Sequence, residues 1–390
     1  MALNPNFERP GVGRPRLVYI DGVRGVAALY VTLYHAVADV HLQGAAIRLA
    51  GWLFQFGHYA VGVFIVLSGY CLMAPVALSA DGKIAGGLRE YARRRMRRIL
   101  PAYYAVLIPA VIAVAIVQRH HAAGTAEEAD VLRLSAGTLF SHLLLVHNLR
   151  PQWATAFDPP MWSVAAECQI YLLFPILLLP VWRRVGSAGL IVCGFALGMA
   201  PHFGLPAQSN LDWTCPWYLG LFALGMAGAV VSFSSCQESA WQRRHVPWGV
   251  LALSFGLAFA ITVVSRPDMP LSAMWLPDTL LGSAISAGII HLTLLTISNQ
   301  NEPSVRSVWK VPLALFESKP STRLGTCSYS LYLLHAPVLW AVTCVASLWR
   351  LDDDGATLAR LLVGVPAAVF AAYSCYSLVE RRFIVRRCQG

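Results

Sequence analysis

The chain has 390 residues, of which 57% are hydrophobic and only 13% are charged, and its mean hydropathy is +0.56. A soluble domain carries about 25% charged residues, so this composition excludes an ordinary soluble protein and indicates an integral membrane protein. The formal net charge of +10 does not indicate a nucleic-acid partner, because the lysines and arginines gather in alternate loops between apolar stretches, as a membrane topology requires.

Apolar stretches of spanning length recur along the whole chain. They cover residues 18–40, 54–77, 99–118, 161–181, 188–204, 213–232, 246–265, 274–297, 326–348 and 356–380. A further apolar segment at 139–149 is too short to cross, which favours a re-entrant or interfacial helix. We therefore predict an all-α polytopic protein with about 10 transmembrane helices.

The lysines and arginines orient these spans. Most of them fall on the side that holds both termini, which the positive-inside rule places in the cytoplasm. We expect a cytoplasmic tail at 1–17, a transmembrane domain at 18–384 and a second cytoplasmic tail at 385–390. The first apolar stretch is too long for a signal-peptide core and no small-residue cleavage site follows it, so we interpret it as a retained span. The longest loop on the outer side, 119–160, is the best place for an external binding surface.

The nine cysteines are scattered without a Cys-x-x-Cys pair or a Cys/His cluster at metal spacing. We interpret them as small buried apolar residues and expect neither disulfides nor a metal ion. Ionisable side chains inside the spans are then the candidates for chemistry, because such groups in a membrane are functional candidates by default.

Two of these groups lie on the first span. Arg24 and His35 are eleven residues apart, about 1,100° of helical rotation, so they share a face within roughly 20° and lie about 16 Å apart along the axis. The alternative is an arginine that reaches the inner headgroups and a histidine bonded to a nearby carbonyl.

An arginine cluster lies at the cytoplasmic end of the third span, in YARRRMRRILP from Tyr91 to Pro101. Guanidinium groups suit bidentate phosphate recognition, so a phosphorylated cytosolic donor is one interpretation. Anchoring to lipid headgroups is the other.

A carboxylate follows in PPMWSVAAECQIYLLFP, from Pro159 to Pro175. Glu167 lies about 9 Å below Met161 along its helix, and His35 lies about 8 Å below the outer end of the first span. At similar depth the two groups can pair, and Glu167 would then raise the basicity of the imidazole. A bond from Glu167 to another buried polar group, such as Gln169 or a serine, is the alternative.

Two more segments carry polar groups into spans. SYSLYLLHAPV, from Ser328 to Val338, places His335 beside Pro337, and a packed histidine is as consistent with this pattern as a ligand contact. VFIVLSGY, from Val63 to Tyr70, contains small residues suited to close helix packing. Four other histidines have no partner that the sequence identifies, and we interpret them as structural: His58, His142, His147 and His291.

These motifs, in this order, resemble the acyltransferase 3 family of polytopic membrane acyltransferases, over nearly the whole chain. The likeness is carried by IDGVRGVAALYVTLYH, VFIVLSGY, RRRMRRILP, MWSVAAECQIYLLFP, SYSLYLLHAPV and LVERRF. By position, the family's conserved motif residues correspond to Arg24, His35, Arg95, Arg98, Glu167, Ser328, Tyr332, His335 and Pro337. Three positions depart from the pattern: Cys168 replaces a second acid, Gly62 stands where many members have Asp, and Arg382 replaces a proline.

The resemblance implies about ten helices and transfer of an acyl group from acetyl-CoA or another acyl-CoA, reached from the cytoplasm, to a hydroxyl, most often on a saccharide. We expect an O-acyltransferase of the cytoplasmic membrane, without an appended esterase-like domain and without a permanently bound cofactor. Its partners would be acyl-CoA, a saccharide or glycoside acceptor and membrane lipids.

Roles for individual residues follow from the motifs and the resemblance together. His35 would act as general base, Arg24 would bind the donor or the developing negative charge, and Glu167 would orient the imidazole. An acyl-histidine intermediate is a less favoured variant. The donor would be held by Arg94, Arg95, Arg97, Arg98 and Ser68. The acceptor side would be formed by Trp162, Ser328, Tyr332 and His335.

Two other functional classes stay open at this point. A transporter or flippase of a lipid-linked or acylated sugar would also have about ten helices and intramembrane charges, although paired broken helices in corresponding halves are not evident here. A membrane protein that kept the fold and lost activity is the other. Transport without an acyl donor would favour the first, and failure to bind coenzyme A would favour the second.

Overall fold

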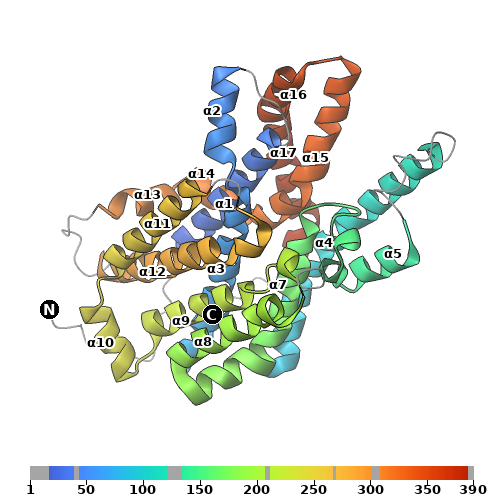
Figure 1. Ribbon diagram of the computed structural model, residues 1–390. Coiled ribbons are helices and arrows are strands. Elements are labelled where there is room, and N and C mark those ends of the chain that lie inside the picture. Colours follow the sequence, from blue (N-terminus) through green and yellow to red (C-terminus); the bar gives the residue numbers. More distant parts are fainter. Residues whose placement is uncertain are drawn as a thin grey trace.

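The computed structural model describes residues 17–38, 44–121, 134–206, 211–266, 269–299 and 308–384. The two predicted tails lie outside these ranges except for Leu17, as do residues 39–40 of the first predicted span and 122–133 of the long outer loop. Every regular element in the described ranges is a helix (Figure 1), which confirms the all-α prediction.

The helices follow one another with few long connections in the described ranges. The first half of the chain contains α1 (Val18–Val37), α2 (Ala45–Phe54), α3 (Gly57–Ala77), α4 (Gly87–His121), α5 (Ala136–Leu143), η3 (His147–Leu149), α6 (Pro151–Ala154), α7 (Met161–Leu173), η4 (Phe174–Leu178) and α8 (Leu179–Gly204). The second half contains η5 (Asp212–Thr214), α9 (Tyr218–Phe233), α10 (Gln237–His245), α11 (Trp248–Ser265), η6 (Leu271–Ala273), α12 (Trp275–Asn299), α13 (Lys310–Glu317), α14 (Lys319–Thr326), α15 (Ser328–Leu348), α16 (Asp353–Ala359), η7 (Arg360–Gly364), α17 (Val365–Cys375), η8 (Tyr376–Glu380) and α18 (Arg381–Phe383).

Eight helical runs in the described ranges are long and apolar enough to cross a membrane. One of them, Met161–Gly204, has 44 residues, about twice what a single crossing needs. It bends at Gly186, where φ is 70° and ψ is −170°, so the fourth and fifth predicted spans fall on either side of this glycine. α1 is not among the eight. The polytopic fold is therefore confirmed, and the number of ten spans and the cytoplasmic termini stay predictions.

The helices differ in how much of their surface is buried. On α11 the side chains of Val250, Leu253, Leu257 and Ile261 are all exposed, and their spacing of three or four residues places them on one apolar face. Such a face is suited to lipid contact. In contrast, every residue of α9 except Leu224 is buried. α9 is thus a central helix, and it packs against α3, α8 and α12 (Figure 1).

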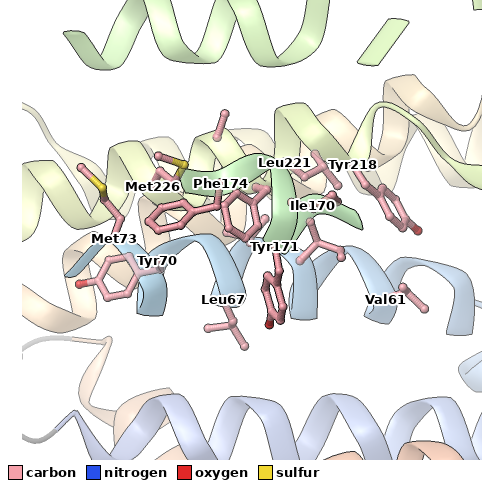
Figure 2. Close-up of a cluster of buried hydrophobic side chains, with 14 of the residues drawn as sticks. Val61, Leu67, Tyr70, Met73, Ile170, Tyr171, Phe174, Tyr218, Leu221 and Met226 are labelled. Atoms are coloured by element: carbon pink, nitrogen blue, oxygen red, sulfur yellow. The ribbon is translucent and has the colours of Figure 1, made fainter. Parts of the chain in front are cut away.

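The contact between α3 and α9 depends on two glycines. A Cβ atom at Gly69 would lie 2.1 Å from the carbonyl oxygen of Phe222, and one at Gly225 would lie 2.0 Å from that of Val66. Only glycine allows the two backbones to approach this closely, which confirms the packing role predicted for the VFIVLSGY segment. Figure 2 shows the resulting core, in which side chains of α3 and α9 meet those of α7 and η4.

α1 packs against α3, α13, α14 and α15. A buried hydroxyl cluster fixes one end of it: Tyr19 of α1 and Tyr70 of α3 lie 2.7 and 2.6 Å from Thr293 Oγ1 of α12. Arg24 follows Tyr19 by little more than one helical turn. The hydroxyl cluster therefore anchors the backbone of α1 close to Arg24.

Candidate active site

A partly open cavity lies between α1, α3, α4, α7 and α15. Six residues that the sequence singled out line it: Arg24, Ser68, Arg98, Glu167, Ser328 and Tyr332. They come from five separate helices. The fold thus gathers half of the predicted site residues around one space.

The cavity holds two cations and one carboxylate. Arg24 has a mostly buried side chain, lies 4.0 Å from Asp21, and interacts electrostatically with Glu167. Arg98 is exposed and interacts electrostatically with both Arg24 and Glu167. Two guanidinium groups thus face one partly enclosed space, which favours an anionic or polarised ligand.

The predicted pairing of Glu167 with His35 is wrong. The carboxylate Oε1 of Glu167 accepts a hydrogen bond of 2.6 Å from Ser68 Oγ and another from the Tyr171 hydroxyl. The alternative of a bond to a serine is therefore the correct one. Gln169, the other alternative partner, bonds to Asn148 instead. The expected equal depth was misleading, because Glu167 lies beside Arg24 in the cavity, about 16 Å along α1 from His35, and its side chain reaches across to α3.

His35 lies instead against the other predicted histidine. The ring centroids of His35 and His335 are 5.0 Å apart, with the ring planes inclined at 39°. His335 is fully buried, its Nδ1 lies 3.2 Å from the Leu331 carbonyl, and its Nε2 has no hydrogen-bond partner. The ring of Tyr332, which lines the cavity, lies 5.8 Å from that of His335. One face of α15 therefore leads from the cavity to the histidine pair.

The four arginines predicted to hold a donor divide into two groups. Arg98 lines the cavity, and Arg95 lies 5.9 Å above the ring of Tyr171. Arg94 is held away from the cavity by the Ala85 carbonyl, 2.8 Å away, and by Glu90. Arg97 is exposed and does not line the cavity. The structure brings only Arg95 and Arg98 to the site.

The predicted acceptor side is also partly assembled. Tyr332 OH lies 2.6 Å from Ser163 Oγ, which joins α15 to α7 at the cavity wall. Ser328 donates to the Gly325 carbonyl while lining the cavity. Trp162 does not line the cavity; its ring stacks on Tyr218 of α9, with centroids 6.3 Å apart.

Sequence reasoning missed the partners of His58. Its Nε2 lies 3.0 Å from Asp278 Oδ2, and Trp217 Nε1 donates to the same oxygen. A Cβ atom at Gly62, where the resemblance has Asp, would lie 3.8 Å from Asp278 Oδ1. Because 220 residues separate His58 from Asp278, no local spacing could have signalled the pair. Tyr171 was likewise missed, although its position four residues after Glu167 on one helix was a usable signal.

The chain matches a known protein family over the region that contains these motifs. A family model described as an acyltransferase domain matches residues 17–378. This chain belongs to that acyltransferase family. The likeness to the acyltransferase 3 family that the motifs indicated is thereby confirmed. No solved structure matches.

Three known proteins are similar in sequence to this acyltransferase. It is 25% identical over 345 residues to Acyltransferase MdmB of Streptomyces mycarofaciens, covering 83% of this chain and 79% of the relative. It is 29% identical over 355 residues to the putative peptidoglycan O-acetyltransferase YrhL of Bacillus subtilis, covering 82% and 48%. It is 23% identical over 379 residues to the peptidoglycan O-acetyltransferase OatA of Listeria monocytogenes, covering 93% and 54%. The chain thus spans only about half the length of the last two.

Proposed function

We propose that this acyltransferase moves an acyl group, most simply acetyl, from acyl-CoA to a hydroxyl of a saccharide or glycoside acceptor at the cytoplasmic membrane. The observation that carries the proposal is the cavity in which Arg24, Arg98 and Glu167 meet, one helical turn along α15 from the His35–His335 pair. The family membership and the names of the relatives support acyl transfer to oxygen.

The donor would enter beside α4. Arg95 and Arg98 are placed to bind its phosphates, because guanidinium groups form strong bidentate hydrogen bonds with phosphate oxygens. Arg98, which is exposed and also lines the cavity, connects the surface with the interior. Arg94 and Arg97 would add long-range attraction rather than direct contact. The pantetheine arm would pass Ser68 and Arg24, and the thioester end would lie beyond them, toward His35.

The reaction moves one proton from the acceptor hydroxyl to the leaving thiolate by way of a base. His35 would take the proton of the acceptor hydroxyl while the hydroxyl oxygen attacks the thioester carbonyl carbon. The carbonyl oxygen then carries negative charge, while Arg24, about 16 Å from His35 along α1, would bind the donor. Collapse breaks the carbon–sulfur bond, the thiolate of coenzyme A leaves, and the proton on His35 passes to it. The products are the acyl ester and free coenzyme A.

Glu167 takes a different role from the one expected at first. Its carboxylate holds the hydroxyl groups of Ser68 and Tyr171 in the cavity wall. Because it also lies within electrostatic reach of Arg24 and Arg98, it would attract both cations and offset their mutual repulsion in the absence of donor. Glu167 is therefore proposed as a positioning residue for the donor pocket. His335, packed on His35, would position that ring.

The test compares cells that carry the gene, cells that lack it, and cells that carry the His35→Ala variant. Mass spectrometry of envelope glycans and small glycosides should find an added acyl group only in the first cells, with equal amounts of protein in the membranes of the first and third. A mass shift that persists with His35→Ala would refute the mechanism. Flux of an unmodified sugar without acyl donor would favour transport instead.

A further inference from the structure

A second group of chemically active side chains lies where three helices begin. His58 is in the first turn of α3, Asp278 is in the first turn of α12, and Cys215 is in the turn between η5 and α9. One ligand atom from each, an imidazole nitrogen, a carboxylate oxygen and a sulfur, all lie within 4.8 Å of one another. None of these three residues is among the described residues that line the cavity between α1, α3, α4, α7 and α15.

The carboxylate of Asp278 is incompletely satisfied. Its side chain has no solvent exposure. Oδ2 accepts a hydrogen bond of 2.7 Å from Trp217 Nε1 and lies 3.0 Å from His58 Nε2. Oδ1 is buried and has no hydrogen-bond partner. A buried carboxylate oxygen without a partner is costly, and proteins satisfy such oxygens with a donor or a metal ion.

Cys215 completes the group. Its side chain is buried, and its φ of 49° lies in the left-handed region. This turn brings Cys215 and Trp217, two residues apart, to the same carboxylate. Thiolate, imidazole and carboxylate are together the ligand types of zinc sites with an open fourth position. One thiolate and one carboxylate also balance the two charges of Zn²⁺, which a buried site requires.

We propose that His58, Cys215 and Asp278 bind Zn²⁺ and thereby join the first turns of α3 and α12 to the turn before α9. The Trp217 N–H would orient the ligating carboxylate, as partners of ligands do in metal sites. The side chain of His58 is 22% exposed, which gives the ion a route. Bonds of about 2.0–2.3 Å around zinc draw the three ligand atoms closer together. The proposal is independent of acyl transfer.

Metal content is the direct test. The full chain, purified in detergent without a polyhistidine tag, is stripped with EDTA, loaded with ZnCl₂, desalted and analysed for zinc. The wild type should retain about one ion per chain, and Cys215→Ser and Asp278→Asn should lose it. Cys193→Ser changes a half-buried cysteine on α8 and should retain the ion. Equal zinc in the wild type and both site variants, or none in the wild type, would overturn the site.

A second measurement needs no variant. Cobalt(II) loaded in place of zinc gives a thiolate-to-metal charge-transfer band in the near ultraviolet when a cysteine is a ligand. The wild-type protein should show this band, and addition of zinc should remove it. Absence of the band from folded, cobalt-loaded wild type would exclude Cys215 as a ligand, whatever the folding of the variants.

Discussion

The imidazole rings of His35 and His335 lie with their centroids 5.0 Å apart, although the two residues are 300 positions apart in the sequence. Only one of these rings was expected to take part in proton transfer. His335 is fully buried and its Nε2 has no hydrogen-bond partner, so its ring packs on His35 with one nitrogen that no other group engages. The orientation of the proposed base therefore depends on α15 as well as on α1.

Replacement of His335 by Phe should test this dependence. The phenyl ring keeps the packing volume but removes both nitrogens, so we expect kcat to fall about 10-fold or more with little change in the amount of folded protein. His291→Phe is the matched control, because His291 is a partly buried histidine of α12 whose Nε2 also has no hydrogen-bond partner. Equal activity in the two variants would show that His335 only fills space.

The two groups of arginines give a prediction for donor binding. Loss of a hydrogen bond to a charged group costs about 1.5–3 kcal/mol, so Arg98→Gln should raise the donor KM about 10-fold to 100-fold. Arg97→Gln removes the same charge from an exposed position that does not line the cavity, and its KM should stay within about threefold of wild type. If both substitutions raise KM equally, the cluster acts through its total charge and not through a phosphate site.

The position of Glu167 predicts how the pH profile responds to its loss. A carboxylate bonded to His35 would raise the pKa of that base, and its removal would move the acidic limb of kcat/KM. Because Glu167 bonds to Ser68 and Tyr171 instead, Glu167→Gln should lower kcat/KM without moving that limb. Tyr171→Phe should lower kcat/KM in the same way. A shift of the acidic limb of kcat/KM in Glu167→Gln, but not in Tyr171→Phe, would contradict this arrangement and support a bond between Glu167 and His35.

The sequence predicted the composition of this site better than its pairings. Apolar length and positive charges are enough to identify helices, and the rise of a helix was used to place His35 and Glu167 near one depth. Neither quantity says which faces of two helices meet. Glu167 bonds to Ser68 because side chains of α3 and α7 meet in the core (Figure 2), where the hydroxyl end of Tyr171 points away from α9 and donates to Ser68 Oγ.

Two further features show the same limit of prediction from the sequence. The His58–Asp278 pair could not be predicted, because it forms between helix ends that are distant in sequence. The number of spans depends on α1, whose Asp21, Arg24 and His35 lower its hydropathy. The tertiary contacts of α1 with α3, α14 and α15 compensate for these groups, and no apolar-length criterion contains that information.

A histidine pair outside the spanning helices predicts a pH effect on stability. His142 and His147 stack with centroids 3.9 Å apart. Burial, together with the neighbouring His142 ring, lowers the pKa of His147 to about 3. The unfolded chain has a histidine pKa of about 6.5. Stability contributed by neutral His147 is therefore present above pH 6.5 and is lost as the pH falls from 6.5 toward 3.

Between pH 6.5 and 5.0 this loss amounts to about 2 kcal/mol. His147→Phe keeps an aromatic ring in the stack and removes the titration, so its apparent Tm should fall less than that of wild type when the pH is lowered from 7.5 to 5.0. Burial raises the pKa of Asp158, which acts with the opposite sign in both proteins and cancels in the comparison. His245→Gln, at an exposed position, is the control and should behave as wild type. Identical pH dependence in wild type and His147→Phe would contradict the assignment.

The most direct measurement of the central claim is acyl transfer by His35→Ala in membrane vesicles, with labelled acetyl-CoA and the acceptor that glycan analysis identifies. We predict a loss of about 100-fold or more in kcat, with coenzyme A binding retained because the arginines of α4 are untouched. His291→Ala should remain active. Transfer at the wild-type rate by His35→Ala, in vesicles that hold equal amounts of the two proteins, would contradict the assignment of His35 as the general base.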